Sequence, residues 1–256
     1  MNNGDPIIRV TDLVMAYGSH VLARDMNFSV SRGSVFVIMG GSGCGKSTLM
    51  RHLVGLQRPA AGHIHLADAD LWSVPEAERD TILRRCGVLF QSGALWSSMT
   101  LGENVALPLQ EYTDLPRDDI ARIVKFKLAL VGLAGSESRY PSELSGGMQK
   151  RAGLARAMAL DPDLLFCDEP SAGLDPITSR RLDELIVTLS RSLGTTVVIV
   201  THELSSLLSI GTDSIFLDPR EQRIVAQGKP TVLRDTSDNP TVRQFLNGGQ
   251  DNGTEE

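Results

Sequence analysis

A glycine-rich run at residues 40–48 constrains this chain more than any other feature. It reads Gly-Gly-Ser-Gly-Cys-Gly-Lys-Ser-Thr and fits the phosphate-binding pattern G-x-x-x-x-G-K-[ST] at every fixed position. An apolar run at residues 35–39 precedes it, and Leu49, Met50 and Leu53 follow at helical spacing. Glycines let successive backbone N–H groups point at a phosphate, and the dipole of the following helix favours negative charge. The pattern therefore predicts a strand–loop–helix unit that binds a nucleoside triphosphate.

Length and charge limit the class of protein. The 256 residues suit one large domain, or one domain with an inserted subdomain. A formal charge of −6 argues against a nucleic-acid partner, because such proteins usually carry a basic face. No apolar run approaches the ~18 residues that a membrane span needs, and residues 1–5 lack a signal region. We expect a cytosolic protein whose membrane role, if it has one, comes through a partner.

Strand and helix signals alternate along most of the chain. Strands are expected at residues 7–38, 62–71, 86–90, 164–167, 197–200, 214–217 and 223–226. Helices are expected near residues 47–56, 117–131, 147–158, 178–193 and 204–210. Strand signals fade between about 92 and 158, where helical ones dominate. The alternation predicts an α/β fold with a largely parallel sheet covered by helices.

Two strands end in polar side chains that suit phosphate chemistry. Asp168 and Glu169 follow an apolar strand and precede Pro170, and His202 follows the apolar run at residues 197–200. Ligands of α/β folds bind at the carboxyl edge of the sheet, so these side chains are expected beside the phosphates. A lone histidine is more often structural, but its place at the sheet edge favours a functional role for His202.

A second run, at residues 144–151, reads Leu-Ser-Gly-Gly-Met-Gln-Lys-Arg. Ser145 precedes two glycines and a predicted helix, so it offers a hydroxyl and backbone N–H groups to an anion. The same serine could simply cap the helix, and the two roles are compatible.

Together, the two runs resemble those of the ABC ATPases, in which the LSGGQ-type signature of one subunit completes the ATP site of another. The resemblance covers residues 5–230 and implies a P-loop NTPase core with a mostly parallel sheet. It further implies an N-terminal antiparallel β-subdomain, an inserted helical subdomain and a head-to-tail homodimer. In this division residues 5–247 form one ABC ATPase domain and residues 248–256 a disordered tail. The core would span about 5–91 and 159–230, the helical insert about 92–158 and a C-terminal extension about 231–247.

The resemblance also implies ATP and Mg²⁺ as cofactors and assigns site residues. Catalysis would fall to Glu169, which polarises the attacking water, to His202, which contacts the γ-phosphate, and to Gln91. Mg²⁺ would be held by Ser47, Gln91 and Asp168. Nucleotide contacts would come from Tyr17, Gly40, Gly41, Ser42, Gly43, Cys44, Gly45, Lys46, Ser47, Thr48, Ser145, Gly146, Gly147 and Asp175. Tyr17 would stack on adenine, although an aromatic before a glycine could equally belong to a turn.

The neighbourhood of Gln91 resembles a subfamily, the ATPases of Mla-type, Mce-associated phospholipid transporters. The matching runs are Phe-Gln-Ser-Gly-Ala-Leu from residue 90, Asn-Val-Ala-Leu-Pro-Leu from residue 104 and the Asn-Pro segment at residues 239–247. The resemblance implies an integral-membrane permease dimer, an Mce-domain substrate-binding protein, a STAS-domain regulator and a place at the cytoplasmic face of the inner membrane. Trp96 would anchor the permease, unless it packs inside the helical subdomain. The alternatives are another ABC transporter, such as an amino-acid importer or lipoprotein exporter, or a soluble iron–sulfur assembly ATPase.

The three cysteines are Cys44, Cys86 and Cys167, without metal-ligand spacing. Cys86 and Cys167 are expected to be small buried hydrophobes. Cys44 lies near a helix N-terminus, where thiol pKa values tend to fall, so sensitivity to oxidation is one hypothesis and a plain fit to the loop is the other.

Overall fold

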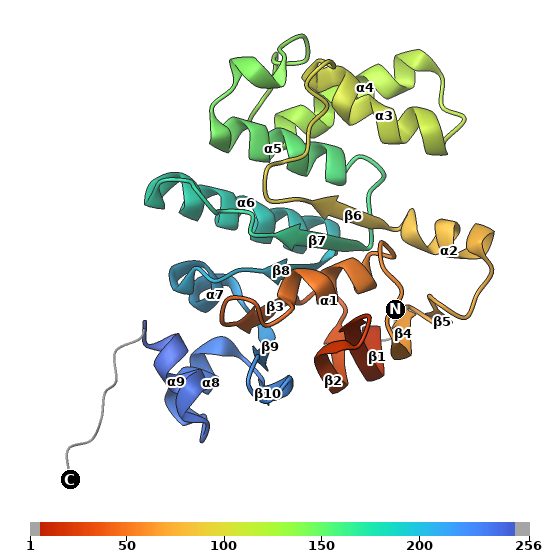
Figure 1. Cartoon of the computed structure of the whole chain (residues 1–256). Coiled ribbons are helices and arrows are strands. Elements are labelled where there is room, and N and C mark those ends of the chain that lie inside the picture. The colour runs from red at the N-terminus through yellow and green to blue at the C-terminus, as the bar shows by residue number, and fades with distance from the viewer. Residues whose placement is uncertain (1–5, 249–256) are drawn as a thin grey trace. The chain divides into compact units, whose positions relative to one another are not determined.

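The computed structural model describes residues 6–248 and groups the chain into two compact units (Figure 1). The first unit contains the residues up to Arg79 and those from Val198 onward, and the second contains Asp80–Val197. The predicted boundaries of the helical insert, at about 92 and 158, stay a prediction, and the predicted tail beyond Gly248 lies outside the described residues.

The first unit begins with an antiparallel sheet in the order β2-β1-β4-β5. Its strands are β1 (Pro6–Tyr17), β2 (His20–Ser31), β4 (Ala61–Leu66) and β5 (Ala69–Asp70). The β1–β2 hairpin closes at the pair Tyr17 and His20. Leu13 and Met15 are fully buried, as the apolar pattern predicts. The predicted N-terminal antiparallel β-subdomain is confirmed.

The parallel part of the first unit carries the glycine-rich loop. Strands β10 (Arg223–Gln227), β9 (Asp213–Asp218), β3 (Val35–Gly40) and β8 (Thr196–Val200) lie in that order. All six residues of β3 are buried, which explains its unbroken apolar sequence. Helix α1 (Lys46–Leu53) follows the loop after β3, and α7 (Leu204–Ile210) follows β8.

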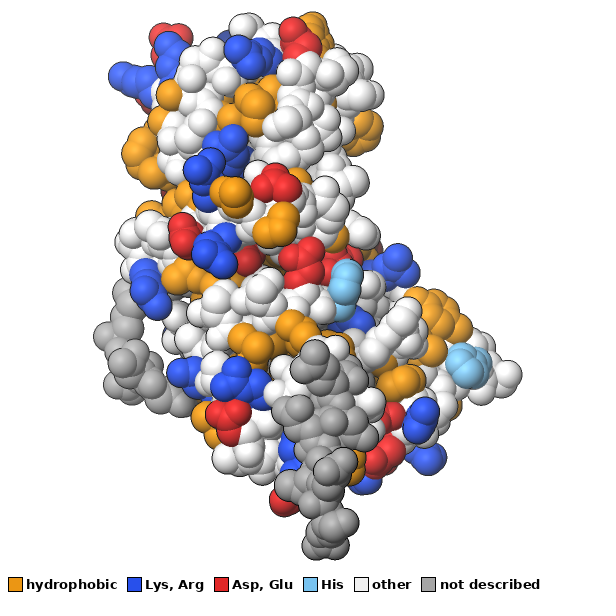
Figure 2. Space-filling model, turned by 90° about the vertical axis from the view of Figure 1, so that its left-hand side faces the viewer, with side chains coloured by type: hydrophobic (Ala, Val, Ile, Leu, Met, Phe, Trp, Pro, Cys, Tyr) orange, Lys and Arg blue, Asp and Glu red, His pale blue; other side chains and the backbone are white. Residues whose placement is uncertain are grey.

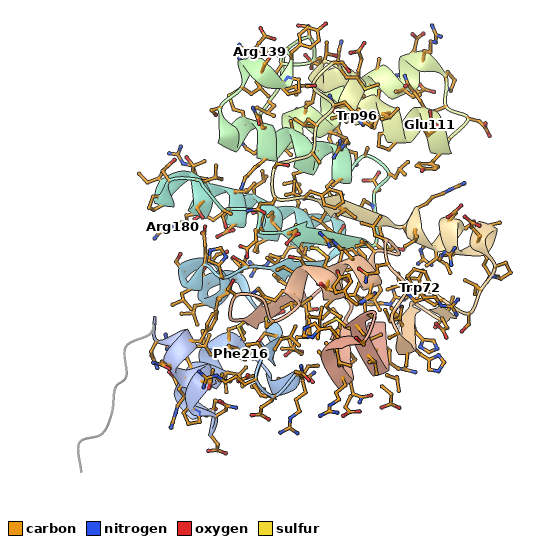
Figure 3. All side chains as sticks on the ribbon, in the orientation of Figure 1. Trp72, Trp96, Glu111, Arg139, Arg180 and Phe216 are labelled. Atoms are coloured by element: carbon orange, nitrogen blue, oxygen red, sulfur yellow. The ribbon has the colours of Figure 1, made fainter. Side chains whose placement is uncertain are left out.

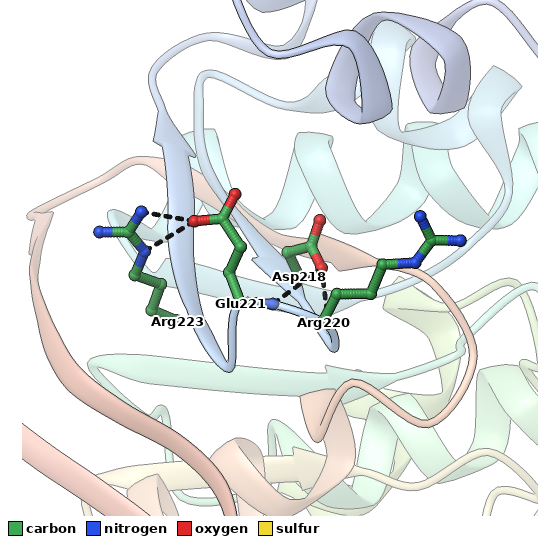
Figure 4. A network of polar contacts seen from close by, with 4 residues as sticks. All are labelled: Asp218, Arg220, Glu221 and Arg223. Carbon is green, nitrogen blue, oxygen red and sulfur yellow. Dashed lines mark hydrogen bonds and ion pairs between the residues drawn. The ribbon is translucent and has the colours of Figure 1, made fainter.

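A polar turn joins β9 to the antiparallel β10 (Figure 4). The Asp218 carboxylate accepts hydrogen bonds from the backbone N–H groups of Arg220 (2.7 Å) and Glu221 (3.3 Å). The Glu221 carboxylate pairs with Arg223. Local hydrogen bonds from an aspartate to the backbone fix such turns, so the carboxyl end of β9 is held in place.

Two helices end the described chain, α8 (Pro230–Thr236) and α9 (Pro240–Leu246). Val242 and Leu246 of α9 are buried in one cluster with Val37 and Met39 of β3. Phe245 packs edge-on against Phe216 of β9, with ring centroids 5.1 Å apart, and Phe216 is labelled in Figure 3. The C-terminal helices therefore cover the strand that leads into the glycine-rich loop.

The second unit holds the parallel pair β6 (Cys86–Leu89) and β7 (Leu164–Asp168), and β8 starts beside β7. Its helices are α3 (Leu101–Tyr112), α4 (Arg117–Leu130), α5 (Gly146–Ala157) and α6 (Pro176–Leu193), with a 3₁₀ turn at Pro141–Glu143. Helix α2 (Glu76–Leu83) precedes β6 and crosses the boundary between the units. The predicted α/β class with a mostly parallel core sheet is confirmed.

The surface mixes charges of both signs with apolar side chains on the face shown in Figure 2. Within residues 6–248, no helix is long and apolar enough to cross a membrane.

Candidate functional site

The glycine-rich loop of the first unit is built for an anion. Lys46 Nζ donates to the carbonyl oxygens of Gly40 and Gly41, at 2.8 Å each. Gly45 is the N-cap of α1 and offers no side chain, so no side-chain oxygen caps the first N–H groups of the helix. The N-terminal N–H groups of a helix and a nearby ammonium fit a phosphate. The observed donor set therefore fits the phosphates of ATP.

Gly40 must be a glycine for steric reasons. Its φ is 146°, and a Cβ there would lie 2.4 Å from the carbonyl oxygen of Leu217 and 2.6 Å from Sγ of Cys44. Neither contact is tolerable, and the first atom belongs to the backbone of β9. The loop thus turns in a space that leaves no room for a side chain.

Cys44 is buried beside Lys46, whose Nζ lies 3.8 Å from its Sγ. Burial raises the pKa of the Cys44 thiol, against the opposing effect of the Lys46 charge. The hypothesis of a lowered thiol pKa is therefore wrong, because desolvation outweighs the nearby cation. Cys44 is instead a small side chain that fills the space beneath Gly40. Cys167 is fully buried, as expected, whereas Cys86 is half-buried.

Tyr17 is 47% exposed and lies beside the helix that follows the loop. Its hydroxyl hydrogen-bonds with Thr48 Oγ1 (3.4 Å) and donates to Gln57 Oε1 (3.2 Å). The bond with Thr48 lowers the pKa of Tyr17. These contacts hold an exposed aromatic ring next to the phosphate loop, where an adenine could stack on it.

The structure brings His202 to the same loop. His202 and Gly41 both line a cavity of about 540 Å³, together with Leu204, Arg220 and side chains of α9. His202 follows β8 and is exposed. The chain separates these two residues by more than 150 positions, and the neighbouring places of β3 and β8 in the sheet explain their shared cavity.

In the second unit, the carboxyl ends of β6 and β7 bring Gln91, Asp168 and Glu169 to one edge. The strands are parallel, with Leu89 opposite Cys167, so both end at the same level. Glu169 adopts a φ of 46°, in the left-handed region. Such a conformation costs about 1–3 kcal/mol in a non-glycine residue and is concentrated at functional sites. The strain sets Glu169 apart from the other carboxylates of this edge.

Ser145 caps α5, the helix that begins in the Leu-Ser-Gly-Gly signature. The predicted role as a helix cap is therefore observed. Its Oγ accepts from the backbone N–H of Met148 at 3.4 Å. Gly146 and Gly147 form the first turn, and a Cβ on Gly147 would lie 2.7 Å from Cγ2 of Thr178. The glycines thus let α6 approach and leave backbone N–H groups at the helix N-terminus.

Asp175 has a structural role that the sequence analysis did not foresee. It caps α6, and its Oδ1 accepts from the backbone N–H groups of Ile177 and Thr178, at 3.1 Å each. The bonds from Thr178 lower the pKa of Asp175. Asp175 can cap the helix and also lie at a subunit interface, because the cap uses only one of its two carboxylate oxygens.

Helix α5 also carries contacts that sequence reasoning missed. Lys150 is buried and donates to the carbonyl oxygens of Glu169 and Ala172. Arg156 donates to the carbonyl oxygens of Gly93 (3.2 Å) and Ala94 (2.7 Å), just after Gln91. A basic side chain in a helix is ordinarily solvated, so neither residue stands out in the sequence.

The predicted site residues thus fall into two groups. The phosphate loop, Tyr17 and His202 lie together in the first unit, whereas Gln91, Ser145, Asp168, Glu169 and Asp175 lie in the second. The described part of the chain holds no cluster of three or more His, Cys, Asp or Glu side chains suited to a metal. Mg²⁺ at phosphates needs only one or two carboxylates, and the Ser47 hydroxyl and the Asp168 carboxylate are oxygen donors of the required kind.

Comparisons with known proteins agree with this geometry. Residues 23–172 match the ABC transporter family. The chain is 41% identical over 242 residues to the intermembrane phospholipid transport system ATP-binding protein MlaF of Escherichia coli (strain K12), covering 94% of this chain and 89% of MlaF. It is 42% identical over 241 residues to a probable ribonucleotide transport ATP-binding protein, Mkl, of Mycobacterium tuberculosis (strain H37Rv). That match covers 94% of this chain, which spans only 66% of the length of Mkl. The dimeric, post-hydrolysis structure of the ATP-binding cassette MJ0796, bound to ADP and Pi, superposes with a TM-score of 0.78 at 27% identity, over 87% of this chain and 98% of that one.

Proposed function

The chain belongs to the ABC transporter family and is an ATPase, and we propose that it powers a phospholipid transporter between membranes. The observation that carries the proposal is the likeness to MlaF, which extends over 89% of that protein's length. The Mkl relatives are named for ribonucleotide transport, but this chain covers a smaller share of their length than of MlaF. Phospholipid is therefore the favoured cargo, and the lipid would be handled by partner subunits.

The site residues take the following roles in the proposed mechanism. Bound ATP would supply the γ-phosphoryl group, and Ser47, Gln91 and Asp168 would hold Mg²⁺, which would supply positive charge beside it. Lys46 exchanges the carbonyl oxygens of Gly40 and Gly41 for phosphate oxygens. Glu169 accepts a hydrogen bond from the attacking water and orients it. His202 donates to the γ-phosphate from the first unit.

We place Ser145 at the nucleotide of a second copy of the chain. Lys46 and Ser145 lie at the N-termini of two different helices, and a helix N-terminus suits a phosphate. A head-to-tail homodimer then holds two ATP molecules, each between the loop of one subunit and the signature of the other. The dimeric cassette structure with 27% identity supports this arrangement.

Replacement of Ser145 by arginine tests the shared site. We expect Ser145→Arg to bind ATP as wild type does, because the phosphate loop is unchanged, yet to lose hydrolysis by at least about 100-fold. Nucleotide binding is measured with a fluorescent ATP analogue and hydrolysis by phosphate release. The matched control is Ser192→Arg, an exposed serine near the end of α6. Equal hydrolysis by Ser145→Arg and wild type would exclude a shared site.

We propose a cavity of about 540 Å³ in the second unit as the permease-docking site. Its lining includes Leu83, Phe90 and Tyr112, with Arg84 stacked on the Tyr112 ring at 4.9 Å. Arg156 lines the cavity and also binds the carbonyl oxygens of Gly93 and Ala94, so an occupant would touch the loop after Gln91. Aromatic and arginine side chains in a pocket are typical anchors of a protein interface.

Trp96 extends this surface beyond the cavity. It is 59% exposed and is labelled in Figure 3, so the alternative of packing inside the unit is wrong. The buried Asn104 side chain accepts from Trp96 N–H (2.8 Å) and donates to three carbonyl oxygens of residues 96–100. The exposed ring is therefore presented on a fixed loop, which lowers the entropic cost of binding a partner.

A negative charge introduced into the cavity is expected to weaken binding between this chain and the permease. Tyr112→Asp should reduce recovery of the permease with the tagged chain by at least about tenfold, since it buries a carboxylate in an apolar contact. ATP hydrolysis by the isolated chain should stay within twofold of wild type. Tyr140→Asp is the control, because Tyr140 is similarly exposed in the same unit and does not line the cavity. Permease recovery that falls equally in both variants would contradict the docking site.

The proposed function is tested by purifying the tagged chain from its native membranes. The expected co-purifying subunits are a permease dimer, an Mce-domain protein and a STAS-domain regulator. The permease would hold this chain at the cytoplasmic face of the inner membrane. A solute-binding protein without an Mce-domain partner would favour an importer of another cargo. Soluble scaffold proteins without a permease would favour iron–sulfur assembly. Bound phospholipid in the purified complex, identified by mass spectrometry, distinguishes lipid from ribonucleotide as cargo.

A further inference from the structure

Lys150 is a buried cation inside the signature helix. It is the fifth residue of α5 and is 6% exposed. Its Nζ donates to the carbonyl oxygen of Ala172 at 2.5 Å and to that of Glu169 at 3.5 Å. A buried ammonium is stable only where polar partners replace water. Its partners include the carbonyl oxygens at the two ends of the turn that carries Glu169.

That turn is strained. Glu169 has a φ of 46°, and its carbonyl oxygen also accepts from the backbone N–H of Ala172 at 3.2 Å. A left-handed non-glycine residue persists only where its surroundings over-determine it. Lys150 adds a contact that reaches the turn from another element, since α5 and β7 are separate in sequence.

Helix α5 links this contact to Ser145. Five residues of α-helix separate Ser145 from Lys150, a rise of about 7.5 Å, and a helix moves over such a length as a rigid body. A shift of the signature toward a nucleotide therefore moves Lys150. Through its hydrogen bonds, Lys150 would move the carbonyl oxygens of Glu169 and Ala172.

We infer that Lys150 is a positioning residue, which holds the Glu169 carboxylate in place and transmits to it the position of the signature helix in the same subunit. The inference rests on the proposed function, because it takes Glu169 as the residue that orients water and Ser145 as a contact of the partner's nucleotide. One subunit would then sense a nucleotide at its signature and adjust its own carboxylate.

The test replaces Lys150 by methionine, which keeps the length of the stem and removes all three donors. We expect Lys150→Met to lower kcat by about 10- to 100-fold while the KM for ATP stays within twofold. Amide hydrogen exchange of residues 170–174, measured by mass spectrometry without nucleotide, should become at least about tenfold faster. Lys150→Arg should restore part of kcat and of the protection, because its donors can reach both carbonyl oxygens.

A second buried lysine in the same unit provides the control. Lys127 is 2% exposed and pairs with Asp161, away from the Glu169 turn. Lys127→Met should lower the melting temperature without changing kcat of the folded enzyme or exchange in residues 170–174. A purely structural Lys150 would behave like Lys127. If Lys150→Met does not fold, Lys150→Gln is measured in the same way, with lower kcat at unchanged KM again expected.

Two results would overturn the inference: exchange in residues 170–174 that is unchanged in the Lys150 variants, or kcat and KM that change only in proportion to lost stability. Failure of the proposed function gives a different result. Wild-type hydrolysis by Glu169→Gln would remove Glu169 from catalysis, yet the exchange measurement would still report whether Lys150 holds the turn.

Discussion

Glu169→Gln is expected to bind ATP and to hydrolyse almost none of it. Glutamine has the shape of glutamate and tolerates the same backbone, so the turn with a φ of 46° at residue 169 should persist. It cannot accept a proton, and loss of a positioned base lowers rates by about 10²- to 10⁴-fold. Phosphate release under single-turnover conditions measures this loss directly.

The same variant should trap the ATP-bound dimer. If hydrolysis releases the two subunits from each other, a variant that cannot hydrolyse ATP should elute as a dimer in ATP and as a monomer without it. Glu184→Gln on the exposed face of α6 is the control and should match wild type in both measurements. Hydrolysis by Glu169→Gln at the wild-type rate would show that another group orients the water.

The sequence predicted the elements that have strong periodic patterns. β3, β7 and β8 are buried strands with unbroken apolar runs, and each was expected within about two residues of its observed bounds. α2 escaped notice because none of its residues is buried, so it has no apolar stripe. α3 contains Pro108, which argues against a helix, although its Thr100–Glu103 capping box was a readable signal.

The C-terminal helices were missed for a similar reason. The run around Asn239 indicates, by its sequence alone, only a resemblance to a subfamily. In the structure Asn239 caps α9, accepting from the N–H groups of Thr241 (2.9 Å) and Val242 (3.4 Å), and Pro240 occupies the first turn. An asparagine followed by proline is a helix-start signal on physical grounds.

Within the candidate site, residue type and strand order placed the phosphate loop, His202, Gln91, Asp168 and Glu169 at strand ends. The sequence could not predict that Lys150 of α5 is buried and Arg156 half-buried, because both look like solvated helix residues until their neighbours are known. Nor could it predict the left-handed backbone of Glu169 or the bond from Lys150 to its carbonyl oxygen.

Lys46→Ala is expected to remove most of the affinity for ATP. A hydrogen bond to a charged group contributes about 1.5–3 kcal/mol, which corresponds to a loss of about 10- to 150-fold in affinity. The stability of the free protein should change little, because Lys46 is half-buried and the carbonyl oxygens of Gly40 and Gly41 that it contacts can bind water instead. Titration of a fluorescent ATP analogue measures the affinity, and thermal unfolding measures the stability.

Lys229→Ala is the control that separates an effect of net charge on ATP affinity from an effect of position. Lys229 is an exposed lysine of the same unit. Removal of one surface charge changes the long-range field by the same formal amount, and at physiological salt such a field is screened within about 8 Å. Lys229→Ala should therefore bind ATP as wild type does. ATP affinity that stays at the wild-type value in Lys46→Ala would place the phosphates away from the loop at residues 40–48. Equal losses in the two variants would instead mean that net charge, and not the position of Lys46, sets the affinity.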